Sequence, residues 1–126
     1  MDMIRLCVDS GFTSVMYDGS DLPYAENVIQ TRRVVDYCHP LGISVEAEIG
    51  HVGGGEGQEQ GSDVDRSAFT DPNEAVSFVR ETNVDALAVA VGTVHGPFKA
   101  KPDLDFSLTK TLGDSVPVPL VMHGAS

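Results

Sequence analysis

Residues 84–92 read VDALAVAVG, a strand-like run in which no polar side chain alternates with the apolar ones from Ala86 to Val91. Antiparallel strands that expose one face to solvent alternate polar and apolar residues. Strands of parallel sheets are apolar throughout, because both of their faces are buried. The run therefore predicts a parallel α/β fold, and we expect helices to cover both faces of its sheet.

Helix and strand patterns alternate along the rest of the chain. Helices are expected over residues 2–9, 23–38 and 70–83 and near 106–112, and further strands over 12–20, 43–50 and 118–124. Repeated βα units of this kind build both doubly wound sheets and (β/α)8 barrels. A length of 126 residues fits one domain over residues 1–126.

Composition excludes several classes of partner. The net charge is −11, and the longest basic cluster is Arg32–Arg33, so no nucleic-acid surface is expected. No run approaches the ~18–20 apolar residues that a membrane span needs. Cys7 and Cys38 lack CxxC spacing, which is typical of a reduced, cytoplasmic chain.

A polar residue stands at the C-terminal end of each predicted strand: Asp18, Glu48, His95 and His123. Parallel α/β folds carry their chemistry at these ends. Two imidazoles and a carboxylate match the three protein ligands of a catalytic zinc site. A strand-terminal histidine is also a common hydrogen-bonded loop residue, so a structural role stays open.

Glu46 shares a strand face with Glu48, because strand side chains repeat every two residues. One of these carboxylates must then be neutralised inside the sheet, either by ligand binding or by a salt bridge. Lys99, Lys101 or an arginine could provide that salt bridge.

The remaining histidines are weaker candidates. His39 precedes Pro40 at a helix end and is interpreted as a helix cap rather than a ligand. His51 lies just past Glu48 in a polar, glycine-rich stretch that runs from Gly50 to Ser67. This stretch matches no phosphate-binding loop, and we interpret it as a lid that carries Glu56 toward a substrate, with a plain linker as the alternative.

Gly96, Gly124 and Ser126 follow the two strand-end histidines. Their backbone N–H groups and the serine hydroxyl could approach a phosphate closely, with Lys99 supplying a charge. Ordinary turn chemistry explains the glycines equally well.

Four stretches together make the chain resemble the class II, metal-dependent ketose-bisphosphate aldolases of the fructose- and tagatose-bisphosphate aldolase family. They are GFTSVMYDGSDLPYAENV (11–28), SVEAEIGHVGG (44–54), TDPNEAVSFVRETNVDALAVAVGTVHG (70–96) and VPLVMHGAS (118–126). The resemblance implies zinc-dependent, reversible cleavage of fructose or tagatose 1,6-bisphosphate to dihydroxyacetone phosphate and glyceraldehyde 3-phosphate. It also implies a homo-oligomer.

The same resemblance implies roles for the metal ligands. His95 and His123 would bind the catalytic Zn²⁺, Glu48 would be the metal-associated glutamate, and Asp18 would lie near a second cation position. Zinc would polarise the substrate carbonyl.

Substrate contacts are implied as well. Glu56 would be the acid that assists proton transfer. Gly96, Gly124 and Ser126 would hold the phosphate of dihydroxyacetone phosphate, with a Na⁺ or K⁺ ion close by.

The sequence departs from the family pattern at both ends. It lacks the family's Leu-Asp-His strand end, which supplies a third zinc histidine and a proton-donating aspartate, and it lacks the last phosphate-binding strand. The resemblance therefore implies a partial TIM barrel that covers strands four to seven, and we expect the isolated chain to be inactive. Two alternatives stay open: a non-catalytic metal-binding half-barrel that acts as an assembly module, and a different metal-dependent aldolase with a non-phosphorylated substrate.

Overall fold

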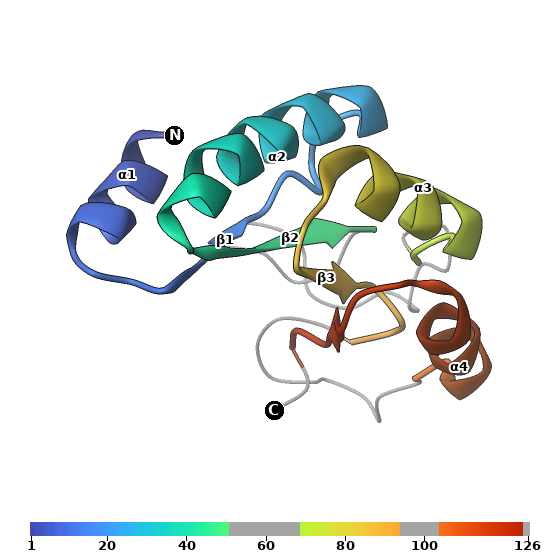
Figure 1. Cartoon of the computed structure of the whole chain (residues 1–126). Coiled ribbons are helices and arrows are strands. Elements are labelled where there is room, and N and C mark those ends of the chain that lie inside the picture. The colour runs from blue at the N-terminus through green and yellow to red at the C-terminus, as the bar shows by residue number, and fades with distance from the viewer. Residues whose placement is uncertain (51–68, 94–103, 125–126) are drawn as a thin grey trace, which may run out of the picture.

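The computed structural model of the chain describes residues 1–50, 69–93 and 104–124. The helices are α1 (Asp2–Asp9), α2 (Tyr24–Cys38), the short 3₁₀ helix η1 (His39–Leu41), α3 (Pro72–Thr82) and α4 (Phe106–Ser115). The strands are β1 (Ser14–Tyr17), β2 (Ser44–Ile49), β3 (Ala86–Val89) and β4 (Leu120–Val121). The predicted alternation of helices and strands is confirmed (Figure 1).

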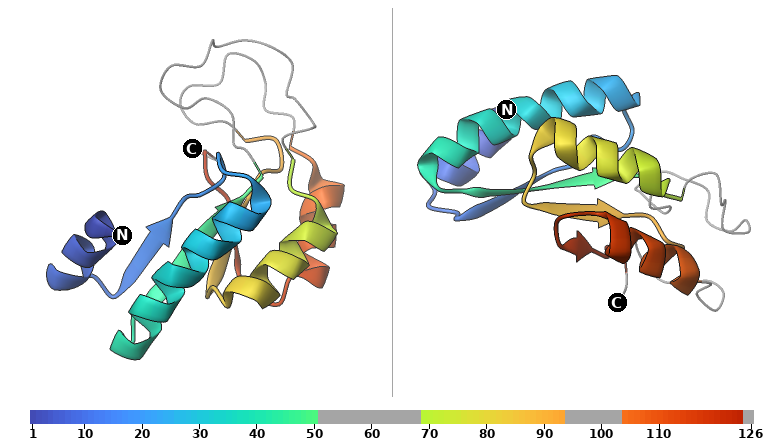
Figure 2. Two further views of the ribbon diagram at one scale, coloured as in Figure 1. Left: turned by 90° about the horizontal axis from the view of Figure 1, so that it is seen from above. Right: turned by 45° about the vertical axis from the view of Figure 1, so that its right-hand side comes forward.

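All strand pairs in the four-stranded sheet are parallel, and the strand order is β1-β2-β3-β4. Each strand therefore pairs with the next one in the sequence, and the intervening helix returns the chain along the sheet (Figure 2). Consecutive parallel pairing of this kind is the arrangement of a (β/α)8 barrel wall, not of a doubly wound sheet with a reversal of strand order.

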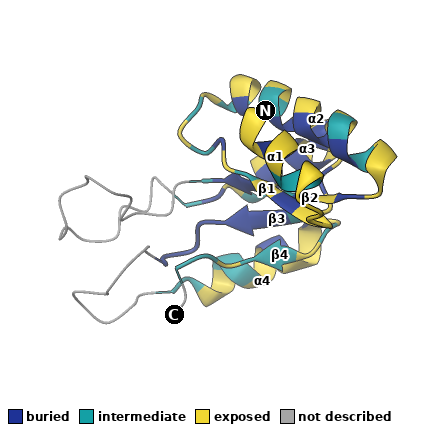
Figure 3. Cartoon of the chain, turned by 90° about the vertical axis from the view of Figure 1, so that its left-hand side faces the viewer, coloured by how far each residue is buried: buried dark blue, intermediate teal, exposed yellow. Residues whose placement is uncertain are grey.

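The hydrophobic core lies between one face of the sheet and the helices. Register places Val15 beside Val45 and Ala47 beside Leu87, and all four side chains are buried in the core cluster. They pack with buried helix residues that include Val34, Val35, Phe78, Val79 and Leu112. In Figure 3 the colour of buried residues lies along the strands and on parts of the helices.

The expectation that helices cover both faces of the sheet is wrong. The opposite face of β2 carries Glu46 and Glu48, and Ala86 and Ala88 lie beside them on β3. The helices follow each other on the core face, as the outer helices of a barrel do (Figure 2). Burial of β3 itself is confirmed, because Leu87, Ala88 and Val89 are all buried.

Local sequence signals explain where the helices begin and end. The Asp71 side chain accepts hydrogen bonds of 2.9 Å from the backbone N–H groups of Asn73 and Glu74, and Pro72 occupies the first turn of α3. Asn83 then ends α3 in the left-handed conformation, with φ of 61°. Within the described ranges, no helix is long and apolar enough to span a bilayer.

Candidate active site

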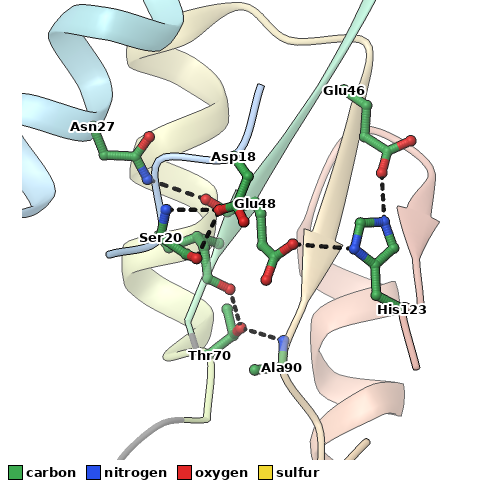
Figure 4. A network of polar contacts seen from close by, with 9 residues as sticks. Asp18, Ser20, Asn27, Glu46, Glu48, Thr70, Ala90 and His123 are labelled. Atoms are coloured by element: carbon green, nitrogen blue, oxygen red, sulfur yellow. Dashed lines mark hydrogen bonds and ion pairs between the residues drawn. The ribbon is translucent and has the colours of Figure 1, made fainter. Parts of the chain in front are cut away.

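The C-terminal ends of the strands bring Glu48 and His123 together, as the sequence predicted. Glu48 lies near the end of β2, and His123 follows β4 by two positions. The two strands are separated by β3, yet Nδ1 of His123 lies 3.1 Å from Oε2 of Glu48 (Figure 4). The register aligns Glu48 with Ala88 and Ala88 with Val121, two positions before His123, and the two side chains meet on the face opposite the helices.

The imidazole of His123 contacts two carboxylates. Its Nε2 lies 2.9 Å from Oε1 of Glu46, while its Nδ1 faces Glu48. The side chains of His123 and Glu46 are 21% and 23% exposed, and that of Glu48 is 3% exposed. Among the described residues, the partner of Glu46 is therefore a histidine rather than the lysine or arginine that we considered; Lys99 and Lys101 lie outside those residues.

Buried polar side chains hold the end of β2 in place. Asn27 on α2 donates a hydrogen bond of 3.0 Å from Nδ2 to the backbone carbonyl of Glu48, and Thr31 donates to Oδ1 of Asn27. Both Asn27 and Thr31 are buried. Sequence reasoning missed them, although two polar residues four apart on the inner side of an amphipathic helix are a usable signal.

Thr70 joins the ends of β2 and β3. Its hydroxyl donates a hydrogen bond of 2.7 Å to the carbonyl of Ile49 and accepts one of 2.8 Å from the backbone N–H of Ala90 (Figure 4). Its own N–H donates to the carbonyl of Ala90. Thr70 thereby ties both strands together beside Glu48 before α3 begins, a role that the sequence did not reveal.

Asp18 follows β1 and serves a local turn. Its Oδ1 accepts hydrogen bonds from the backbone N–H and the hydroxyl of Ser20, at 2.9 and 2.7 Å. Gly19 between them leaves room for Asn27, since a Cβ at this position would lie 2.3 Å from Oδ1 of Asn27. The loop after β1 is therefore packed directly against the residue that supports Glu48.

The donor types at this strand end suit a divalent cation, because imidazole nitrogen and carboxylate oxygen are both ligands of Zn²⁺. Within residues 1–50, 69–93 and 104–124, no group of three or more His, Cys, Asp or Glu side chains forms a complete metal site. Glu48 and His123 thus provide a partial donor set. His95, the second predicted histidine ligand, lies outside the described residues.

The other predicted site residues divide into two groups. Gly124 is described and has a φ of 62°, a left-handed conformation that glycine adopts readily directly after His123. The remaining candidates, His51, Glu56, Gly96, Lys99 and Ser126, lie outside the described residues.

His39 lies at the opposite end of the sheet, where β2 and β3 begin. It ends α2, as predicted, and its Nε2 lies 2.9 Å from Oδ2 of Asp85. Asp85 also accepts a 2.7 Å hydrogen bond from the backbone N–H of Val45. A shallow pocket of about 330 Å³ lies beside this pair, lined by His39, Gly42, Ile43, Ser44 and Asp85. Active sites of barrel enzymes lie at the other end of the strands, so we assign this pocket no catalytic role.

Comparison with known protein families identifies the family to which this α/β chain belongs. The family model described as class II fructose-bisphosphate aldolase matches residues 1–126. The chain belongs to the class II fructose-bisphosphate aldolase family. This membership confirms the resemblance, and it fits the partial (β/α)8 barrel that the parallel sheet forms.

Individual aldolases support the assignment. A fructose-bisphosphate aldolase of Staphylococcus aureus is 48% identical over 119 residues, which are 94% of this chain and 41% of that protein. The YdjI aldolase of Escherichia coli K12 has a similar structure, with a TM-score of 0.84 and 40% identity over 100% of this chain and 42% of that one. A fructose-bisphosphate aldolase of Campylobacter jejuni shares the fold, with a TM-score of 0.63 and 23% identity over 95% of this chain and 38% of that one. The chain thus spans about two fifths of the length of the aldolases that it matches.

Proposed function

We propose that this chain carries the metal-binding part of an aldolase site for the zinc-dependent, reversible cleavage of a ketose 1,6-bisphosphate. The products would be dihydroxyacetone phosphate and glyceraldehyde 3-phosphate. The observation that carries the proposal is the meeting of His123 with Glu48 at the strand ends, 3.1 Å apart, in a member of the class II aldolase family. Fructose 1,6-bisphosphate is the first substrate to test and tagatose 1,6-bisphosphate the second.

His123, His95 and Glu48 are the proposed zinc ligands, with Asp18 near a second cation position. A bound Zn²⁺ would supply Lewis-acid polarisation of the substrate carbonyl. The burial of Glu48, which is only 3% exposed, supports its role, because buried carboxylates are commonly paired or coordinate a metal.

The chain's own residues would bind the substrate and move the proton. Gly96, Gly124 and Ser126 would donate hydrogen bonds to the substrate phosphate, and Lys99 would add a positive charge. Glu56 would exchange a proton with the substrate carbon next to the carbonyl. A Na⁺ or K⁺ ion beside the phosphate and assembly into a homo-oligomer belong to the same proposal, and the free thiols of Cys7 and Cys38 support a cytoplasmic setting.

Zinc binding and turnover test this function separately. The purified chain is freed of metal with a chelator, and zinc affinity is then measured by competition with a chromophoric chelator. We expect one zinc ion per chain, and we expect His123→Asn to weaken binding by at least about 100-fold, because a direct ligand contributes more than the outer partners whose loss costs about 10–100-fold. His39→Asn is the matched control, since His39 lies at the opposite end of the sheet and should leave the affinity unchanged.

Turnover is measured by coupled detection of dihydroxyacetone phosphate, with and without the chelator. Cleavage of either bisphosphate that disappears with the chelator and returns with zinc supports the aldolase proposal. Zinc binding without turnover is the result we expect of the isolated chain. A stable dimer with stoichiometric zinc and no turnover favours the metal-binding half-barrel, in which this chain acts only as part of an assembly. No zinc binding at all would refute the metal site.

A further inference from the structure

Glu46 stands two positions before Glu48 on the same face of β2 and reaches the same imidazole from the other side. Its Oε1 lies 2.9 Å from Nε2 of His123, across 77 residues of sequence. Both side chains are nearly four-fifths buried. A hydrogen bond in this setting is weakened less by water than one at the surface, so the contact restrains the orientation of the ring.

The chemistry of the pair assigns the two ring nitrogens different tasks. A histidine that binds a metal through one ring nitrogen keeps its proton on the other, and a carboxylate placed as Glu46 is can accept a hydrogen bond from that N–H. Glu48 lies nearer the C-terminal end of β2 than Glu46 does, on the side where barrel enzymes bind their ligands. Nδ1, which faces Glu48, is therefore the nitrogen left to bind a metal.

We propose that Glu46 is a positioning residue that holds the Nε2–H of His123 and so presents Nδ1 to the metal on the Glu48 side. This inference rests on the proposed function, because it takes His123 as a metal ligand. Carboxylates that accept the second N–H of a metal-binding histidine fix its tautomer and orientation and raise its basicity. In this place Glu46 would act through His123 and would not itself be a metal ligand.

Zinc affinity of Glu46 variants tests the proposal. We expect Glu46→Ala to weaken zinc binding about 10–100-fold, the usual cost of removing such an outer partner. Glu46→Gln keeps a side-chain oxygen that can accept the Nε2–H, so it should recover most of the lost affinity. Glu74→Gln removes one charge from an exposed position on α3 and should change nothing.

A spectroscopic readout separates positioning from a general structural effect. The chain is labelled with ¹⁵N-histidine, and the His123 signals are assigned by their loss in His123→Asn. In the zinc-loaded, unaltered chain we expect a protonated Nε2 and a metal-bound Nδ1. This measurement needs no Glu46 variant, so it holds even if Glu46→Ala does not fold.

Two results would overturn the role of Glu46 and leave the aldolase function standing: zinc on Nε2 of His123, or a folded Glu46→Ala chain with unaltered zinc affinity. Failure of the unaltered chain to bind zinc would instead remove the proposed metal function and this inference with it. Far-UV circular dichroism of each variant establishes that the compared chains are folded.

Discussion

The side chain of Asn27 donates a 3.0 Å hydrogen bond to the backbone carbonyl of Glu48 and so links helix α2 to the end of strand β2. The contact fixes the backbone of Glu48, whose side chain meets His123 on the other face of the sheet. A helix on the core side thereby determines the position of a candidate ligand on the opposite side. Stability and site geometry are coupled through this one amide.

We expect Asn27→Ala to lower the free energy of unfolding by about 1–3 kcal/mol, because it leaves the buried carbonyl of Glu48 without this donor. The hydroxyl of Thr31 loses its acceptor as well. Urea denaturation followed by circular dichroism measures the change. Asn73→Ala, at an exposed position, is the control and should stay within about 0.5 kcal/mol. Equal stability of the two variants would show that the Asn27 amide does not support β2.

Gly19 and Gly113 should respond in opposite directions to an added methyl group. A Cβ at Gly19 would meet Oδ1 of Asn27 at 2.3 Å, so Gly19→Ala should destabilise the fold by about 1–3 kcal/mol through overpacking. Gly113 lies within α4, and a methyl group added there would meet no neighbouring atom of the described residues within 4 Å. Gly113→Ala should therefore stabilise the chain by about 0.5–1 kcal/mol. Thermal unfolding of both variants measures the sign. If Gly19→Ala stabilised the chain instead, the loop after β1 would have to shift and make room for the methyl group at little energetic cost.

Thr70→Val removes the hydroxyl that joins β2 to β3 and keeps the shape of the side chain. The backbone N–H of Ala90 then loses its acceptor, and we expect a loss of about 1–3 kcal/mol in the free energy of unfolding. The exposed Thr111, whose hydroxyl donates within its own helix, provides the matched Thr→Val control, with an expected change below about 0.5 kcal/mol. Hydrogen exchange at the Ala90 amide should accelerate in Thr70→Val, and an unchanged rate would argue against the bridge.

Alkaline pH should lower the free energy of unfolding, because the phenol of Tyr24 ionises more easily in the unfolded chain. Burial raises the pKa of the Tyr24 phenol well above its ordinary value of 10.0, and the hydrogen bond to Glu81 adds to this effect. The neutral phenol is thus favoured in the folded chain. Its contribution to stability is complete below about pH 10 and is lost as the pH rises from there toward the raised pKa, because only the unfolded chain ionises in that window.

Tyr24→Phe should therefore flatten the decline in stability above about pH 10. Urea unfolding at about pH 9 and about pH 11 compares the variant with the unaltered chain across this window. Ultraviolet titration of the folded chain checks the cause directly. If Tyr24 ionises at the same pH in folded and denatured protein, the proposed coupling is absent.

Local patterns in the sequence were sufficient to place the helices and the order of the strands. The helix expected over 23–38 is Tyr24–Cys38, and the one expected over 70–83 is Pro72–Thr82. Such elements follow from hydrophobic periodicity and capping residues, which act over a few positions of the chain. The last strand, expected over 118–124, is limited to Leu120–Val121, because strand bounds depend on pairing with β3 as well as on composition.

The sequence by itself determined the parallel βα units, the aldolase resemblance and the meeting of Glu48 with His123, because parallel strands bring their carboxyl ends to one edge. Only the tertiary structure decided that the helices share one face, that Glu46 reaches Nε2 of His123, and that Asn27 and Thr70 support the strand ends. These contacts join residues about 20 to 77 positions apart. Their existence depends on the register, tilt and curvature of the assembled sheet, which no local pattern in the sequence specifies.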